Sequence, residues 1–97
     1  MEVIGLQRLD IDLSAVGSSA ELHILLRDAL GFPAWYGCNW DAFWDAITGL
    51  VEMPRQLSFH GGSTLSQRLP DDARLLAQCL ERMRAEYPQW APQVKWL

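Results

Sequence analysis

The apolar positions of the chain recur with helical spacing in three segments. The first runs from Leu22 to Leu30. Ser18–Glu21 precedes it with the spacing of a capping box, and Gly31–Pro33 follows it, so a helix is predicted between these signals. A second helix is predicted over about Trp40–Leu50 and a third from Pro70 to Tyr87.

Three other segments have the composition of β-strands. Val3–Leu9 is short and rich in apolar residues, Gln56–His60 alternates polar and apolar residues, and Gln93–Leu97 ends the chain. Gly61–Ser63 is predicted to be a loop. The predicted order is β-α-α-β-α-β, which favours an α/β fold with a small three-stranded parallel sheet packed with helices.

The length of 97 residues is that of a single domain, here 1–97. Hydrophobic residues make up 49% of the chain and include five Trp, which is enough apolar area for a core and excludes a disordered chain. No apolar run could span a bilayer, and the N-terminus lacks the pattern of a signal peptide. We therefore expect a cytoplasmic protein in which Cys38 and Cys79 are free thiols.

The net charge of −4 and the pI of about 4.9 argue against direct binding to nucleic acid. An acidic domain can still bind a basic protein that itself binds nucleic acid. The sequence contains no C-x-x-C pair and no cluster of His and Cys residues, so no metal site or cofactor is predicted.

The predicted second helix carries an unusual charge pattern. On a helical wheel Trp40, Phe43 and Ile47 share an apolar sector, and Asp41 and Asp45 lie together in the next one. The two carboxylates repel each other, and Lys and Arg are absent from this helix. Asp41 favours the helix dipole, whereas Asp45 lies in mid-helix, where Asp is a poor helix former. The pattern suggests a surface for a cation-rich partner, although such pairs are most often solvated surface.

The segment from Pro33 to Pro54 contains a longer motif. Its residues Tyr36-Gly37-Cys38-Asn39-Trp40-Asp41-Ala42-Phe43-Trp44-Asp45, followed by Glu52-Met53-Pro54, closely resemble the signature of the barstar family of intracellular ribonuclease inhibitors. Glu21-Leu22-His23 matches the start of the first helix in that family. The strong match covers about residues 21–54, and the rest of the chain adds only the order of its elements.

The resemblance implies that an acidic helix and the loop before it plug the active site of a ribonuclease. Asp45 would take the main phosphate-mimicking role and Asp41 a supporting one, while Trp35 would contact the catalytic site as an interface aromatic residue. A glutamate of the third helix in the family aligns with Arg82 or nearby, and Glu86 is close to that position. The partner-binding residues implied in this way are Trp35, Tyr36, Gly37, Asn39, Asp41, Trp44, Asp45, Thr48 and Glu86.

The expected function is that of a bacterial immunity protein in a toxin–antitoxin pair, a monomer that forms a 1:1 complex with a basic, barnase-like ribonuclease. A regulatory module that keeps the fold but binds another class of protein is the alternative. An enzyme is not expected, because His23 lies on a helix, His60 stands alone, and the sequence offers no nucleophile–base pair or phosphate-binding loop.

Overall fold

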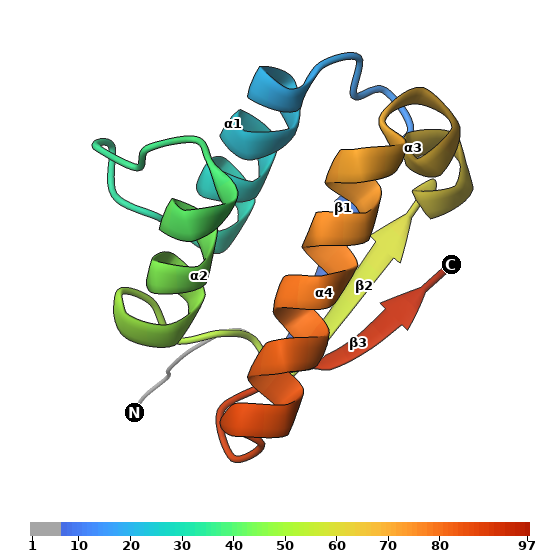
Figure 1. The fold of residues 1–97 in the computed structure, drawn as a ribbon. Helices are drawn as coiled ribbons and strands as arrows, with labels where there is room; N and C mark the ends of the chain where they lie inside the picture. Colours follow the sequence, from blue (N-terminus) through green and yellow to red (C-terminus); the bar gives the residue numbers. More distant parts are fainter. Residues whose placement is uncertain (1–6) are drawn as a thin grey trace.

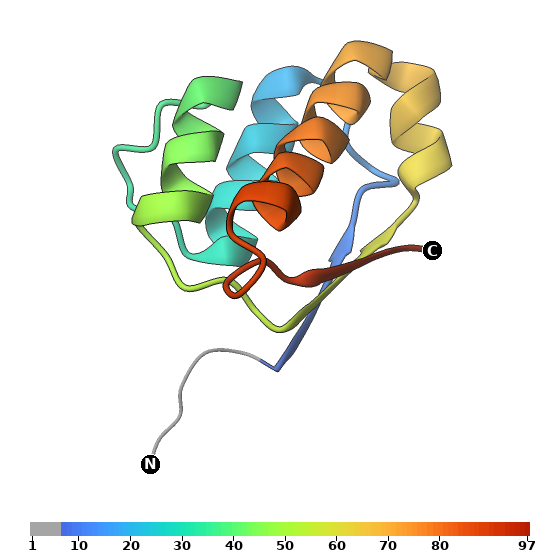
Figure 2. The ribbon, with the colours of Figure 1, turned by 60° about the horizontal axis from the view of Figure 1, so that its bottom comes forward.

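The computed structural model describes residues 7–97 of the chain. Its elements in chain order are β1 (Arg8–Asp12), α1 (Ser19–Leu30), α2 (Trp40–Gly49), β2 (Gln56–His60), α3 (Gly62–Arg68), α4 (Pro70–Glu86) and β3 (Gln93–Trp96). The strands form one parallel sheet in the order β1-β2-β3. In Figure 2 the helices α1, α2 and α4 lie on one side of this sheet. The predicted α/β fold with a three-stranded parallel sheet and the order β-α-α-β-α-β is therefore confirmed, with one short helix added.

The sheet places most of its apolar and polar side chains on opposite faces, although the polar Ser58 of the central strand is also buried. Ile11, Leu57 and Phe59 occupy alternate positions and are buried toward the helices, whereas Asp10 and His60 are exposed. This alternation follows from the two-residue repeat of a strand, which places neighbouring side chains on opposite faces. The helical layer adds buried residues from α1, α2 and α4, so that a single core lies between the two layers.

The first strand lies further along the chain than predicted. We expected it at Val3–Leu9, but β1 spans Arg8–Asp12, and residues 3–6 of the expected strand lie outside the described residues. The prediction followed apolar content, whereas the strand follows an alternation in which Leu9, Ile11 and Leu13 point inward.

The prediction of a loop at Gly61–Ser63 is also wrong, because the short helix α3 begins at Gly62. Gly61 precedes it with φ of 76°. A Cβ atom at this position would also lie 2.8 Å from the Ser14 backbone nitrogen. Both the positive φ and this close approach therefore require glycine. Leu65 is the buried residue of α3, and one apolar position gives no period to detect in a sequence.

The signals at both ends of α1 are present in the structure, although Glu21 bonds to Gly17 and not to the N-cap residue Ser18. Ser18 Oγ accepts a hydrogen bond from the Glu21 backbone N–H at 3.1 Å, and Glu21 Oε1 accepts one from the Gly17 N–H at 2.8 Å. At the other end Gly31 adopts a left-handed conformation with φ of 77°. None of the helices in the described part of the chain is long and apolar enough to cross a membrane.

Candidate functional site

The helix α2 exposes its carboxylates and buries its apolar side. Phe43 and Ile47 are each 1% exposed, whereas Asp41 and Asp45 are exposed to solvent. Among the ion pairs formed within residues 7–97, none involves either aspartate. The helical wheel is confirmed on these points, and the surface formed by Asp41, Trp44, Asp45 and Thr48 is called the α2 face below.

Asn39 fixes the start of α2. Its Oδ1 accepts a hydrogen bond from the Ala42 backbone N–H at 2.7 Å, which satisfies one of the unpaired donors at the helix terminus. Its Nδ2 donates to the Gly37 carbonyl oxygen at 3.2 Å. A Cβ atom at Gly37 would lie 3.3 Å from that Nδ2, so a larger residue there would press on the cap. Asn39 therefore couples the position of the helix to the shape of the loop before it.

The α1–α2 loop (residues 31–39) carries an exposed tryptophan. Trp35 is 72% exposed, although a side chain of this size gains most from burial. Cys38 adopts a positive φ of 54°, which is uncommon for a residue other than glycine. In Figure 1 this loop leads directly from α1 into α2 at one end of the molecule. An exposed tryptophan on a constrained loop is typical of a protein-binding surface.

Tyr36 differs from the other predicted site residues because it is buried. Its hydroxyl lies 2.6 Å from Nδ1 of His23 on α1, and it also donates to the Asn39 carbonyl oxygen at 3.4 Å. His23 is itself only 1% exposed. The helix predicted for His23 is confirmed, but its contact with Tyr36 was not predicted. The apolar residues Leu22 and Leu26 on the same helix were the available signal, and both are buried. Tyr36 thus ties the loop to α1.

A second contact ties α2 to α4. The indole Nε1 of Trp40 donates to Asp72 Oδ1 at 2.9 Å, and the Trp40 ring lies 4.4 Å from the His23 ring between centroids. Trp40, His23 and Tyr36 thereby link α1, the α1–α2 loop, α2 and α4 in one connected group. The α2 face is therefore presented on a preorganised support, which reduces the entropy lost on binding.

The buried histidine predicts a loss of stability in mild acid. Burial lowers the pKa of His23 below its ordinary value of 6.5, and Asp72 opposes this effect only in part. The unfolded chain therefore binds more protons than the folded one below about pH 6.5, so stability is complete above this pH and declines as the pH falls toward the folded pKa. Urea unfolding at pH 7.5 and pH 5.5 should show this decline, and His23→Gln should reduce it. An unchanged pH dependence in His23→Gln would assign the decline to other groups.

Two further predicted residues form internal contacts at the edge of the α2 face. The Thr48 hydroxyl donates to the Trp44 carbonyl oxygen at 2.6 Å, one helical turn earlier. Glu86 on α4 accepts a hydrogen bond from Arg82 Nε at 2.7 Å. The Arg82 guanidinium carbon lies 4.1 Å from the centroid of the Trp44 ring. The structure thus brings Glu86 beside α2 through Arg82, a residue that the sequence signals did not place in the site.

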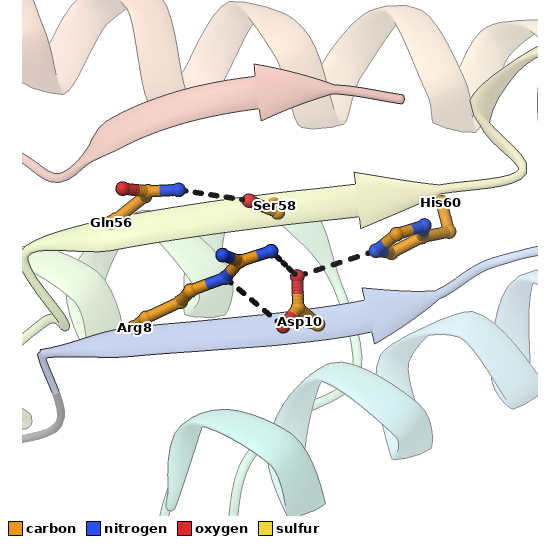
Figure 3. Close-up of polar contacts among 5 residues, drawn as sticks. All are labelled: Arg8, Asp10, Gln56, Ser58 and His60. Atoms are coloured by element: carbon orange, nitrogen blue, oxygen red, sulfur yellow. Dashed lines mark hydrogen bonds and ion pairs between the residues drawn. The ribbon is translucent and has the colours of Figure 1, made fainter.

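Another polar cluster lies on the face of the sheet away from the helices. Figure 3 shows Arg8, Asp10 and His60 converging across β1 and β2, with Asp10 Oδ1 3.2 Å from Arg8 Nη2 and 3.3 Å from His60 Nε2. Hydrogen bonds from Arg8 and His60 lower the pKa of Asp10. All three groups are exposed, and Arg8 and His60 both pair with Asp10, so the carboxylate has its partners within the cluster.

Two other features concern metal and ligand binding. Residues 7–97 contain no group of three His, Cys, Asp or Glu side chains arranged to hold a metal ion. A groove of about 740 Å³ lies between the segments that follow α2 and α4, and Trp90 and Leu50 are among its lining residues. It meets the α2 face only at Thr48.

Cys38 and Cys79 are both free thiols in the structure, as expected.

Comparison with known proteins agrees with the resemblance found in the sequence motif. The family model described as "Barstar (barnase inhibitor)" matches residues 6–95 of the chain. A protein of Bacillus subtilis strain 168, named YrdF and described as a candidate ribonuclease inhibitor, is 36% identical over 70 residues, an alignment that covers 68% of this chain and 77% of YrdF. The family match extends well beyond residues 21–54, where the motif lies, and includes α4 and the strands of the sheet. With its three-stranded parallel sheet, its acidic α2 and the loop before it, the chain belongs to the barstar family.

Proposed function

We propose that this protein inhibits a basic ribonuclease by inserting the α2 face and the α1–α2 loop into the active site of that enzyme. Membership of the barstar family and the likeness to YrdF support the inhibitor role. The observation that carries the mechanism is the exposure of Asp41 and Asp45, without ion-pair partners among residues 7–97, on a helix capped by Asn39.

A ribonuclease binds a polyanion, so its active site gathers cationic side chains. In the proposed complex the Asp45 carboxylate stands where an RNA phosphate would lie, and Asp41 supports it one helical turn earlier. Trp35 supplies apolar contact area at the rim of the site, and the remaining exposed residues, Gly37 and Asn39, line the same surface. The helix and its supports are already ordered, so the carboxylates need not be positioned during binding.

Three other predicted residues have a supporting role in the proposed complex. Tyr36 positions the α1–α2 loop through its hydroxyl and does not contact the partner broadly, because its ring is buried against Phe32 and His23. Thr48 lies on the α2 face, where its hydroxyl donates to the Trp44 carbonyl oxygen. Glu86 borders this face and accepts a hydrogen bond from Arg82. The protein acts in the cytoplasm as an immunity protein, and it forms a 1:1 complex with the ribonuclease.

The direct test is capture followed by an activity assay. The protein is immobilised, incubated with an extract of its source cells and their secreted proteins, and the captured partner is assayed for RNA cleavage with and without added inhibitor. We expect a basic ribonuclease whose activity falls to zero at one equivalent of inhibitor. Capture of a partner without RNA-cleaving activity would instead favour a regulatory module that shares the fold.

Binding to this ribonuclease should be fast and sensitive to salt. Opposite charges on the two proteins steer their encounter, and ions screen this attraction over about 10 Å at 0.1 M ionic strength. In stopped-flow measurements the association rate constant should fall as salt rises from about 0.05 to 0.5 M, while the dissociation rate constant changes much less. An association rate that is flat across this range would show that steering plays no part.

A further inference from the structure

The α2 face is bordered by a cation that its acidic character does not explain. The Arg82 guanidinium carbon lies 4.1 Å from the Trp44 ring centroid, and Arg82 Nε donates to Glu86 Oε2 at 2.7 Å. Stacking and this hydrogen bond together hold the planar guanidinium over the ring. No other hydrogen bond of the guanidinium is formed within residues 7–97, so donors remain for a partner.

Arg82 lies close to the carboxylates of α2. Trp44, on which it stacks, directly precedes Asp45 and follows Asp41 by three residues. Burial raises the pKa of the Cys79 thiol on α4, while Arg82 lowers it and Asp41 raises it. The stacking on Trp44 therefore places the Arg82 cation on the α4 side of the helix that carries the two carboxylates.

This arrangement changes what a partner meets. A protein that approaches Trp44 finds a guanidinium over the ring in place of an open aromatic surface, and the Arg82 side chain is 58% exposed. A basic partner gains from Asp41 and Asp45 but is repelled at Arg82 unless it has an acceptor there. Like charges placed opposite each other at an interface are an effective means of rejecting partners.

We propose that Arg82 is a specificity-determining residue, which selects a ribonuclease that carries a carboxylate opposite Trp44 and disfavours ribonucleases that are basic at this point. This inference rests on the proposed function, since it concerns the choice among ribonucleases at the same face. The partner it describes has a mixed surface that is cationic opposite Asp41 and Asp45 and anionic opposite Arg82.

Barnase, the ribonuclease named in the description of the family, serves as the probe of a basic enzyme. Its affinity is measured by titration calorimetry with the natural protein, Arg82→Glu, Arg82→Lys and Arg84→Glu. Arg84 is the matched control, because it lies on the same helix about 200° away and is also ion-paired, to Glu81. Arg82→Glu should bind barnase about tenfold more tightly than the natural protein, Arg82→Lys should bind like it, and Arg84→Glu should differ by less than about twofold.

Several results would overturn the proposal. Equal gains in Arg82→Glu and Arg84→Glu would show a general charge effect, and an unchanged or weaker affinity in Arg82→Glu would show that Arg82 rejects nothing. Absence of barnase binding in every variant would also end it, while the proposed function would still be decided by the captured partner. If Arg82→Glu unfolds in urea earlier than the natural protein, the neutral Arg82→Gln replaces it, with a gain of about threefold expected.

Discussion

Asp45→Ala should weaken binding to the captured ribonuclease by at least about thirtyfold. In the proposed complex Asp45 is desolvated against several cationic groups, and its removal leaves them buried without a partner. Truncating one member of such a pair costs about 2–5 kcal/mol, compared with about 0–1 kcal/mol for an exposed pair. At roughly 1.4 kcal/mol per factor of ten, the lower bound corresponds to the stated loss. The inhibition constant in an RNA-cleavage assay measures it.

The control for this substitution is Asp71→Ala. Asp71 is an exposed carboxylate in the first turn of α4, so its removal changes the net charge equally without touching the α2 face. It should change the inhibition constant by less than about threefold, and Asp41→Ala should fall between the two. Asp41→Ala and Asp45→Ala should not lower the urea midpoint of unfolding. Each removes the repulsion between two carboxylates four residues apart on a helix, which is neutral or favourable for stability. An Asp45→Ala protein that unfolds easily yet inhibits fully would make Asp45 structural.

Local patterns were sufficient to predict most of the fold. The cap at Ser18, the helix that begins at Pro70 and the strand at Gln56–His60 each depend on a few neighbouring residues, and each is present in the structure. The prediction was wrong where a short element gave a weak local signal. The strand β1 was placed too early because apolar content outweighed alternation, and α3 was missed because one buried leucine defines it.

The candidate site was predictable only in part for a related reason. Exposure of Asp41 and Asp45 follows from the wheel of a single helix, and exposure of Trp35 agrees with its place in a loop. The contacts His23–Tyr36, Trp40–Asp72 and Arg82–Trp44 join separate elements, and their geometry depends on how α1, α2 and α4 pack. A sequence pattern defines the face of each helix, but it does not determine which residues meet across two faces.

The contact between His23 and Tyr36 predicts a second large effect, a loss of folding stability. Tyr36→Phe should lower the free energy of unfolding by about 1–3 kcal/mol, because Nδ1 of the buried His23 loses its partner 2.6 Å away. The ring volume is kept, so the change reports the hydrogen bond and not a cavity. For a domain whose total stability is about 5–15 kcal/mol, urea unfolding monitored by tryptophan fluorescence resolves this loss.

Tyr87→Phe is the control, because the Tyr87 side chain is exposed and the structure gives its hydroxyl no hydrogen bond within residues 7–97. It should change stability by less than about 0.5 kcal/mol. His23→Gln combined with Tyr36→Phe should cost less than the sum of the single changes, since both remove one interaction. Additive losses, or equal losses in Tyr36→Phe and Tyr87→Phe, would show that the His23 contact does not stabilise the loop. If the contact does position the α1–α2 loop, Tyr36→Phe should also weaken ribonuclease inhibition, whereas Tyr87→Phe should leave it unchanged.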